Sequence, residues 1–283
     1  LYKLSMLNLD TLEVIIELNP KDPWSEILIA ELSESGFDSF VQTDNGIIAY
    51  ANASLNADEV LQNSSLKLDE VQSNVSKNII PHQNWNAQWE ENFHPVFVEE
   101  YASILAPFHN VSEAKGMSVI IQPQMSFGTG HHQTTWMMTK FLFEMPQIAK
   151  NVLDMGTGTG VLAIFAEKLG AERVLAIDIE DWSAENAILN AELNNTNKIE
   201  VLCGDVDLLG DETFGLIIAN INKNVLKMHM ETYANCLDKS GTLLLSGFFM
   251  SDIQELKEFA AQFGLSLVEE INKDEWAAMK LTK

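Results

Sequence analysis

Three glycines and an aspartate have the types and spacing of a nucleotide-binding site. Gly156, Gly158 and Gly160 follow an apolar, strand-like stretch and precede an apolar-periodic, helix-like stretch at 161–169. Closely spaced glycines let the backbone turn tightly against a ligand, and the first N–H groups of the following helix are free to face it. Asp178 ends the next apolar stretch, where a carboxylate can accept hydrogen bonds from ribose hydroxyls.

The spacing of the glycines favours one class of cofactor. It reads Gly-x-Gly-x-Gly, whereas the dinucleotide fingerprint is Gly-x-Gly-x-x-Gly, with a pyrophosphate at the helix N-terminus. S-adenosylmethionine carries no phosphate, so its turn needs close approach more than anion binding. A nicotinamide-dependent oxidoreductase remains an alternative, since it would use the same glycines and Asp178.

Asn220 is the candidate catalytic residue. It ends the apolar stretch 214–220, and its side-chain amide offers both a donor and an acceptor. Beside the reactive end of the cofactor it could hold an amine with its lone pair aimed at the methyl group. The alternative is that Asn220 only caps the next helix. Asp205 could accept from the adenine amino group, or it could be an exposed loop residue.

His131 and His132 are adjacent in a polar, glycine-containing loop. Neighbouring side chains of an extended chain point apart, and no second ligand pair lies at a useful spacing, so we expect no metal site. The sequence instead predicts that this pair forms hydrogen bonds that shape the loop Phe127 to Thr135 over the cofactor.

The second half of the chain alternates between strand-like and helix-like stretches, which predicts an α/β fold. Alternation of this size indicates a mostly parallel, Rossmann-like sheet covered on both faces, with ligands at the carboxyl ends of its strands. The last two strand-like stretches, 265–271 and 276–281, lack a crossover helix and should pair antiparallel. Such a C-terminal edge is a feature of class I methyltransferases and is not expected of an ordinary dehydrogenase.

The first half predicts a smaller α+β domain. Residues 1–82 read β-α-β-β-α-β, beginning with a strand at Leu9 to Leu18, and this order is the ferredoxin-like plan. A helical linker at 83–95 follows, and 96–283 form the catalytic domain. In the linker Trp85, Trp89 and Phe93 lie four residues apart, a stripe that we interpret as a packing surface between the domains.

Composition limits the partners. The chain has 283 residues with 17 basic and 41 acidic side chains, a formal net charge of −24. Nucleic-acid binding relies on clustered Lys and Arg, so we expect no direct nucleic-acid binding and consider a basic protein partner more plausible. An acidic surface that only keeps the protein soluble is an equally open alternative. The sequence shows neither a membrane-spanning stretch nor a signal peptide, so we expect no membrane association and a cytoplasmic location. The oligomeric state does not follow from the sequence.

Several motifs together resemble one enzyme family, the bacterial ribosomal protein L11 methyltransferases. They are Trp85-x-x-x-Trp89-x-x-x-Phe93-His94-Pro95, the loop Phe127-Gly128-Thr129-Gly130-x-His132-x-Thr134-Thr135, the glycine turn, Ala219-Asn220-Ile221 and the closing Glu275-Trp276. The loop is much more specific than the glycine turn. The family often has Asp-Pro-Gly where this chain has Gln122-Pro123-Gln124, and proline in place of Gln133. The N-terminal module agrees in plan but shares no motif.

The resemblance implies an S-adenosylmethionine-dependent enzyme that trimethylates lysines of a basic large-subunit ribosomal protein, with the N-terminal α-amine as a further candidate. The ferredoxin-like module would recognise that substrate, and a flexible linker would present several amino groups to one pocket. Family cofactor contacts carry over to Thr135, Gly156, Asp178 and Asn220; Gly158 belongs to the same turn, and Phe127 resembles a pocket wall. A methyltransferase for another protein or a small amine, and a non-catalytic binding module, remain alternatives.

Overall fold

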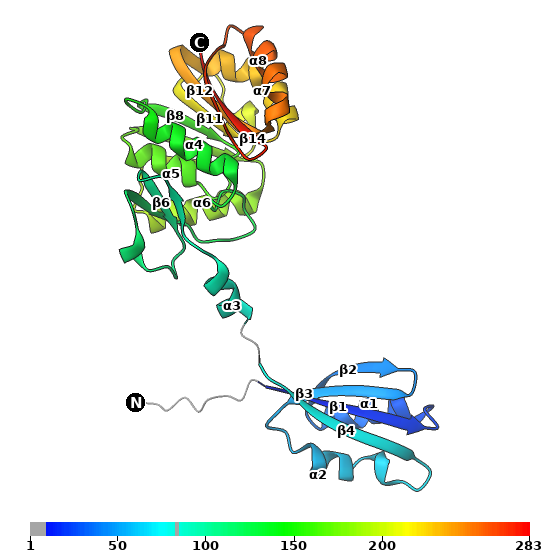
Figure 1. Cartoon of the computed structure of the whole chain (residues 1–283). Coiled ribbons are helices and arrows are strands. Elements are labelled where there is room, and N and C mark those ends of the chain that lie inside the picture. The colour runs from blue at the N-terminus through cyan, green and yellow to red at the C-terminus, as the bar shows by residue number, and fades with distance from the viewer. Residues whose placement is uncertain (1–9, 83–84) are drawn as a thin grey trace. The chain divides into compact units, whose positions relative to one another are not determined.

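A computed structural model of the chain describes residues 10–82 and 85–283. The chain divides into two compact units, residues 1–92 and 93–283, whose elements are labelled in Figure 1. The division falls inside the segment that the sequence analysis assigns to a linker. Leu9, the expected start of the first strand, and residues 83–84 of that linker lie outside the described residues.

The first unit has the ferredoxin-like order of elements that the sequence predicts. Its described part contains β1 (Thr11–Asn19), α1 (Trp24–Glu34), β2 (Phe37–Thr43), β3 (Gly46–Asn52), α2 (Ala57–Gln62), the 3₁₀ helix η1 (Ser65–Lys67), β4 (Gln72–Ile80) and α3 (Trp85–Asn92). The strands form one antiparallel sheet in the order β2-β3-β1-β4.

One face of this sheet forms the core of the first unit. Alternate residues of β1, from Leu12 through Val14 and Ile16 to Leu18, are buried, as a strand with one covered face requires. They pack with Leu28 and other apolar residues of α1 and α2. The opposite face carries the other positions of β1, which include Thr11, Glu13, Ile15 and Glu17, and none of them is fully buried, so the sheet has one open face.

The hairpin between β2 and β3 turns one residue earlier than its Asn-Gly pair suggests. Thr43 pairs with Gly46, so Asp44 and Asn45 are the central residues and Gly46 belongs to β3. A Cβ atom on Gly46 would lie 2.0 Å from the carbonyl oxygen of Ile16. This close approach of β1, rather than the turn itself, requires the glycine.

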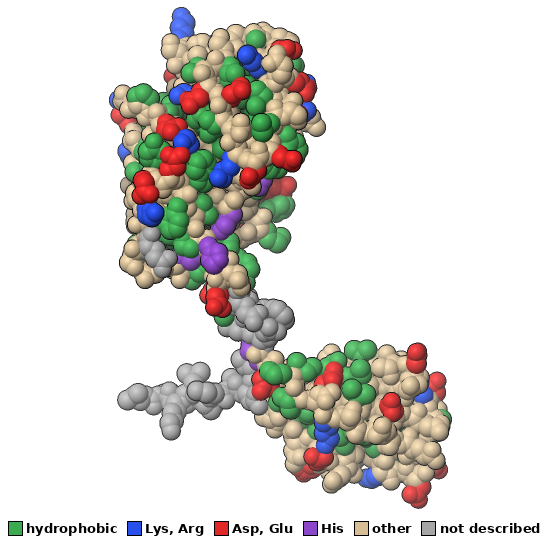
Figure 2. Space-filling model, viewed as in Figure 1, with side chains coloured by type: hydrophobic (Ala, Val, Ile, Leu, Met, Phe, Trp, Pro, Cys, Tyr) green, Lys and Arg blue, Asp and Glu red, His purple; other side chains and the backbone are tan. Residues whose placement is uncertain are grey.

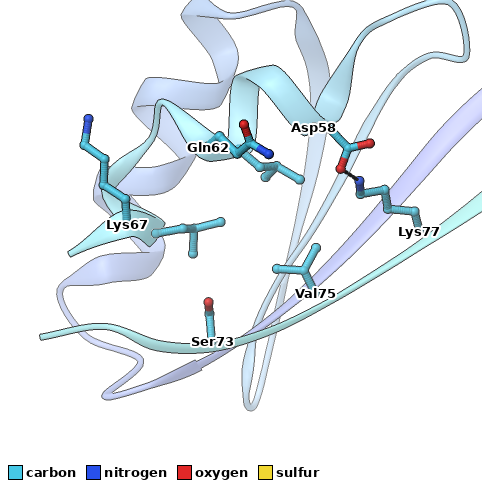
Figure 3. A pocket seen from close by; sticks show the side chains of 8 residues that line it. Asp58, Gln62, Lys67, Ser73, Val75 and Lys77 are labelled. Atoms are coloured by element: carbon cyan, nitrogen blue, oxygen red, sulfur yellow. Dashed lines mark hydrogen bonds and ion pairs between the residues drawn. The ribbon is translucent and has the colours of Figure 1, made fainter. Parts of the chain in front are cut away.

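A shallow hollow of about 460 Å³ lies between α2, η1 and β4 in the first unit (Figure 3). Lys77 of β4 forms an ion pair with Asp58 of α2 at one end, and Lys67 stands at the other. Val75 lies on its floor. An exposed pair of this kind contributes at most about 1 kcal/mol, so the antiparallel backbone pairing of β4 with β1 holds this edge of the sheet, and Val75 is the one partly buried residue of β4.

The second unit is described throughout. It contains β5 (Val96–Val98), β6 (Ala102–Leu105), η2 (Val111–Glu113), β7 (Met117–Ile120), α4 (Gln133–Glu144), β8 (Asn151–Met155), α5 (Val161–Lys168), β9 (Arg173–Asp178), α6 (Asp181–Leu193), β10 (Ile199–Cys203), η3 (Val206–Leu208), β11 (Phe214–Asn220), α7 (Lys223–Cys236), β12 (Leu237–Phe249), η4 (Met250–Asp252), α8 (Ile253–Ala261), β13 (Ser266–Lys273) and β14 (Trp276–Thr282).

The large sheet of this unit has the order β10-β9-β8-β11-β12-β14-β13. β14 runs antiparallel to both β12 and β13, while the other neighbouring strands are parallel. The predicted parallel sheet with an antiparallel C-terminal edge is confirmed. Strand order reverses between β8 and β11, and ligands of open α/β sheets bind at such a switch point.

Both faces of this sheet are buried. Along β8, Val152 packs in the core that contains α4 and α5, whereas Leu153 packs in the core that contains α7 and α8. β11 alternates in the same way, with Ile218 on the first side and Ile217 on the second. The continuous apolar strands of the sequence therefore reflect burial of both faces of the sheet. A ligand has to bind at the edge formed by the carboxyl ends of the strands.

Two short strands were not predicted. β5 and β6 join β7 in a three-stranded sheet, with β5 antiparallel and β7 parallel to β6. The expected role of the linker's aromatic stripe as a packing surface between the domains stays a prediction. Trp89 is 48% exposed, and the ring of Phe93, the first residue of the second unit, packs on His131 with a centroid distance of 4.4 Å. The side chain of Trp85 lies outside the described residues.

The surface reflects the acidic composition. On the face shown in Figure 2, Lys and Arg side chains stand singly among Asp and Glu, and no basic patch gathers there. None of the helices in the described part of the chain is long and apolar enough to cross a membrane.

Candidate functional site

The glycine turn after β8 requires glycine at three positions. Gly156, Gly158 and Gly160 have φ angles of 72°, 55° and 79°, in the left-handed region that favours glycine. A Cβ atom on Gly156 would lie 2.2 Å from a methyl group of Ile221, and one on Gly158 would lie 2.1 Å from the carbonyl oxygen of Phe127. The turn is therefore packed directly against the segment after β11 and against the Phe127 loop.

Asp178 ends β9 and holds the glycine turn in place. Its Oδ2 accepts a hydrogen bond from the N–H of Gly158 at 2.8 Å, and its Oδ1 accepts one from the N–H of Glu180 at 3.1 Å. The side chain is 9% exposed. Each carboxylate oxygen can accept a further hydrogen bond, so Asp178 can support the turn and bind a hydroxyl at the same time.

Asn220 ends β11 on a cavity of about 370 Å³ at the switch point. Its Oδ1 is buried and has no hydrogen-bond partner among the described residues. The helix-capping alternative is wrong, because Asn222 is the N-cap of α7 and its Oδ1 accepts from the N–H of Val225 at 3.2 Å. A buried acceptor without a partner costs about 1–3 kcal/mol, which a bound donor would offset.

The cavity brings together most of the residues that the sequence analysis selects. It is lined by Phe127, Gly156, Gly158, Asp178 and Asn220, which come from four segments: the Phe127 loop, the glycine turn and the ends of β9 and β11. Asp205 also lines it. The Asp205 side chain in addition accepts a hydrogen bond from the N–H of Asp207 and so caps η3.

Thr135 lies apart from this group. It is completely buried in the first turn of α4 and does not line the cavity. Its Oγ1 has no hydrogen-bond partner among the described residues, while its carbonyl oxygen accepts from Thr139 at 2.8 Å. The sequence did not reveal this burial, because the direction of a first-turn side chain depends on how α4 packs.

The two histidines form hydrogen bonds within the loop, as predicted. The His131 ring bonds to the carbonyl oxygen of His94 at 2.9 Å and to the Thr129 hydroxyl at 3.2 Å. The His132 Nδ1 lies 2.8 Å from the Thr134 hydroxyl. No set of three His, Cys, Asp or Glu side chains in the described residues is arranged to hold a metal ion.

Gln133 takes part in a further loop contact. Its Nε2 donates to Oδ2 of Asp274 at 2.7 Å, which ties the start of α4 to the turn between β13 and β14. Gln133 stands where the family often has proline. A proline would restrict the backbone of the loop, whereas Gln133 anchors the loop through its side chain.

An aromatic row extends from the cavity and was missed as a unit by the sequence analysis. The rings of Phe127 and His132 have centroids 5.0 Å apart, His132 and Trp276 are 4.6 Å apart, and Trp276 and Phe249 are 4.4 Å apart. Burial lowers the pKa of His132 from its ordinary value, which favours the neutral form of the ring. The row therefore offers an uncharged aromatic wall to a cationic group.

Helix α7 supplies a second unpredicted part of the lining. Asn222, Val225 and His229 face the cavity, at the spacing of one side of a helix. The His229 Nδ1 is buried and has no partner among the described residues. This spacing is visible in the sequence, but a helical spacing of three and four residues does not tell which side of a helix faces a cavity.

Asp154 lies beneath the glycine turn and is 1% exposed. Burial raises its pKa to about 7, although the hydroxyl of Thr157 donates to its Oδ2 at 2.7 Å and a backbone hydrogen bond from Ala163 also favours the charged form. The nearby Asp178 carboxylate raises the pKa further. Asp154 accordingly changes its charge near neutral pH inside the folded protein.

We expect Asp154→Asn to reduce the pH dependence of stability. A carboxyl group with a raised folded-state pKa favours folding fully below its unfolded pKa, and this contribution is lost as pH rises through about 7. Each pKa unit corresponds to about 1.4 kcal/mol. Urea unfolding at pH 5, 6, 7 and 8 should show the variant gaining stability relative to the wild type by a few kcal/mol. Parallel curves for the two proteins would contradict the assignment.

Comparison with known proteins identifies the family. The model of the family "Ribosomal protein L11 methyltransferase" matches residues 11–283. The chain belongs to this family. It is a methyltransferase with the class I fold.

Individual relatives of this methyltransferase agree with that assignment. A ribosomal protein L11 methyltransferase of Porphyromonas gingivalis is 45% identical over 91% of this chain and 90% of its own length. One of Phocaeicola vulgatus is 37% identical over 95% and 98%. The crystal structure of a ribosomal protein L11 methylase from Lactobacillus delbrueckii subsp. bulgaricus is 27% identical, with a TM-score of 0.61, and covers 68% of this chain and 99% of its own.

Proposed function

We propose that this methyltransferase transfers methyl groups from S-adenosylmethionine to amino groups of ribosomal protein L11, namely lysine side chains and the N-terminal α-amine. The observation that carries the proposal is the buried, unpartnered Oδ1 of Asn220, which lies on the same cavity as the glycine turn and Asp178. The substrate comes from the names of the relatives.

The residues present fit S-adenosylmethionine. The glycine turn presents backbone without side chains to the cavity at Gly156 and Gly158, and Asp178 retains acceptor capacity for ribose hydroxyls. Asp205 is placed to accept from the adenine amino group, and Phe127 forms a wall. We assign Gly156, Gly158, Asp178, Asn220 and Phe127 to direct contact. We also assign Thr135 to the cofactor site, because its hydroxyl at the start of α4 has no hydrogen-bond partner among the described residues.

When bound, the cofactor supplies an electrophilic methyl group on a sulfonium. The protein has to orient the accepting amine and keep it unprotonated. The Asn220 carbonyl oxygen can accept one N–H of the amine, which directs the nitrogen lone pair towards the methyl group. Asn220 cannot take up a proton, so we assign it positioning alone.

A lysine amine has an ordinary pKa of about 10.4, so it must lose a proton before it attacks. Desolvation of the amine along the aromatic row, next to a cationic centre, lowers that pKa. The neutral His132 ring avoids repelling a lysine on its way to Asn220. The same rings can pack on the methylene groups of the lysine and on the product methylammonium.

We further propose that the first unit binds the substrate protein. It has its own core and one open sheet face, and the whole chain has an excess of 24 negative charges. A ribosomal protein rich in lysine fits such a charge by electrostatic attraction. We place this reaction in the cytoplasm, where ribosomal proteins are made.

Mass spectrometry tests the activity directly. Purified protein, S-adenosylmethionine and unmodified ribosomal protein L11 should yield whole methyl increments in mass, and peptide mapping should locate them on amino groups. An unchanged mass of ribosomal protein L11, with methylation of another protein from the same cell extract, would replace the proposed substrate.

Binding separates the cofactor alternatives. S-adenosylhomocysteine should raise the melting temperature, as a ligand that binds only the folded protein must, and NAD should not. Stabilisation by NAD alone would contradict the proposal. S-adenosylhomocysteine binding without methyl transfer to any protein or small amine would favour a non-catalytic binding module.

A further inference from the structure

Helix α6 and its C-cap carry three buried asparagines at intervals of four residues. Asn186 and Asn190 are completely buried, and Asn194 is 8% exposed. Residues four apart lie on one side of a helix, so these amides form a single polar stripe in an otherwise apolar interior. Buried amides are costly unless their hydrogen bonds are made, and the partners of this stripe therefore indicate its role.

The stripe binds the free edge of β7 and the residues just after it. One edge of β7 pairs with β6, and Ile121 continues this pairing by donating to Leu105. On the other edge, Asn194 accepts from the N–H of Ile120 at 2.8 Å and donates to its carbonyl oxygen at 2.6 Å. Asn190 accepts from the N–H of Gln122 at 2.8 Å. The amides thus replace a neighbouring strand.

Unlike Asn194, Asn190 also contacts the glycine turn. Its Nδ2 donates to the carbonyl oxygen of Thr159 in the glycine turn at 2.8 Å. Thr159 in turn donates its N–H to Phe127 at 2.9 Å and its hydroxyl to Gly128 at 2.7 Å. A closed circuit of hydrogen bonds therefore runs from residue 122 through Asn190 and Thr159 to the Phe127 loop.

We propose that Asn190 is a positioning residue. It couples the local ordering of the loop at 123–130 to ligand binding on the glycine turn. Asn190 accepts a hydrogen bond from Gln122, the residue just before the loop. Asn190 also donates to Thr159, and Thr159 donates its N–H to the carbonyl oxygen of Phe127 in the loop. The inference rests on the proposed function, because it takes the turn as the cofactor site. Coupling is reciprocal, so a ligand on the turn orders the loop, and an ordered loop strengthens ligand binding.

Two matched variants test the proposal. In Asn190→Asp the carboxylate still accepts from Gln122 but cannot donate to Thr159 and repels its carbonyl oxygen. Asn194→Asp loses its donated bonds to Ile120 and to the Asn190 carbonyl oxygen in the same way, yet touches no residue of the glycine turn. The measurements are the melting temperature, the Kd for S-adenosylhomocysteine by calorimetry, and hydrogen exchange of the amides at 123–130.

We expect both variants to lower the melting temperature. Only Asn190→Asp should raise the Kd by about tenfold or more and speed exchange at 123–130, since loss of coupling lets the loop open locally. Asn194→Asp should bind S-adenosylhomocysteine within about twofold of the wild type. Equal effects of the two variants on Kd and on loop exchange would overturn the proposal, because the stripe would then act on stability alone.

Thr159→Val decides the matter if Asn190→Asp does not fold. Valine keeps the shape of threonine but cannot donate to Gly128, so it removes one of the two bonds between Thr159 and the loop and leaves the backbone bond to Phe127. Faster exchange at 126–130 without ligand is expected, and unchanged exchange would overturn the coupling. Exchange of the free protein does not need the cofactor. Failure of the wild type to bind S-adenosylhomocysteine would therefore count against the proposed function and not against the circuit.

Discussion

Replacing Asn220 with alanine is expected to lower kcat by about two to three orders of magnitude, the usual effect of removing one preorganised polar group at a reacting centre. The Kd for S-adenosylhomocysteine should change less than about tenfold, because Asn220 orients the amine and contributes little of the cofactor cradle. The alanine side chain also removes the buried, unpartnered Oδ1, so stability should fall little or rise. Single-turnover methyl transfer, calorimetry and urea unfolding measure these three quantities.

Asn222→Ala provides the comparison. Asn222 is two residues away and caps α7, so its loss should cost about 1 kcal/mol of stability and affect kcat much less. If the two variants lose the same stability and the same activity, Asn220 has a structural role only, and the catalytic assignment is wrong.

The parts of the site that lie on strand ends could be predicted from sequence. Gly156, Asp178 and Asn220 each follow an apolar stretch of the length of a strand, and the parallel arrangement implied by alternating helices places such ends on one edge. The same reasoning yielded the antiparallel C-terminal pair, because no crossover helix separates β13 from β14.

Parts that depend on packing between distant segments could not be predicted. β5 and β6 have three and four residues, too few for a periodic pattern to emerge. The row from Phe127 to Trp276 joins residues far apart in the chain, and no local spacing indicates it. Asn190 is completely buried although it is polar, and its partners Gln122 and Thr159, which lie far from it in the chain, explain why.

Replacing Gly158 with alanine is expected to raise the Kd for S-adenosylhomocysteine by about a hundredfold or more, about 2.7 kcal/mol or greater. A Cβ atom would lie 2.1 Å from the Phe127 carbonyl oxygen, which is backbone and cannot rotate away. That oxygen also accepts from Thr159, so the clash displaces the loop and the turn together. Calorimetry and unfolding measure the result.

Gly210→Ala separates this clash from the strain of the backbone conformation. Gly210 has a φ angle of 53°, nearly that of Gly158 at 55°, but a Cβ atom there would meet nothing within 4 Å. Both variants incur the cost of a left-handed alanine, about 1–2 kcal/mol of stability. Only Gly158→Ala should also weaken S-adenosylhomocysteine binding, since only there does the new methyl group enter the contact between turn and loop. Equal Kd values for the two variants would mean that the glycine serves the shape of the turn alone and that close approach is not what this site requires.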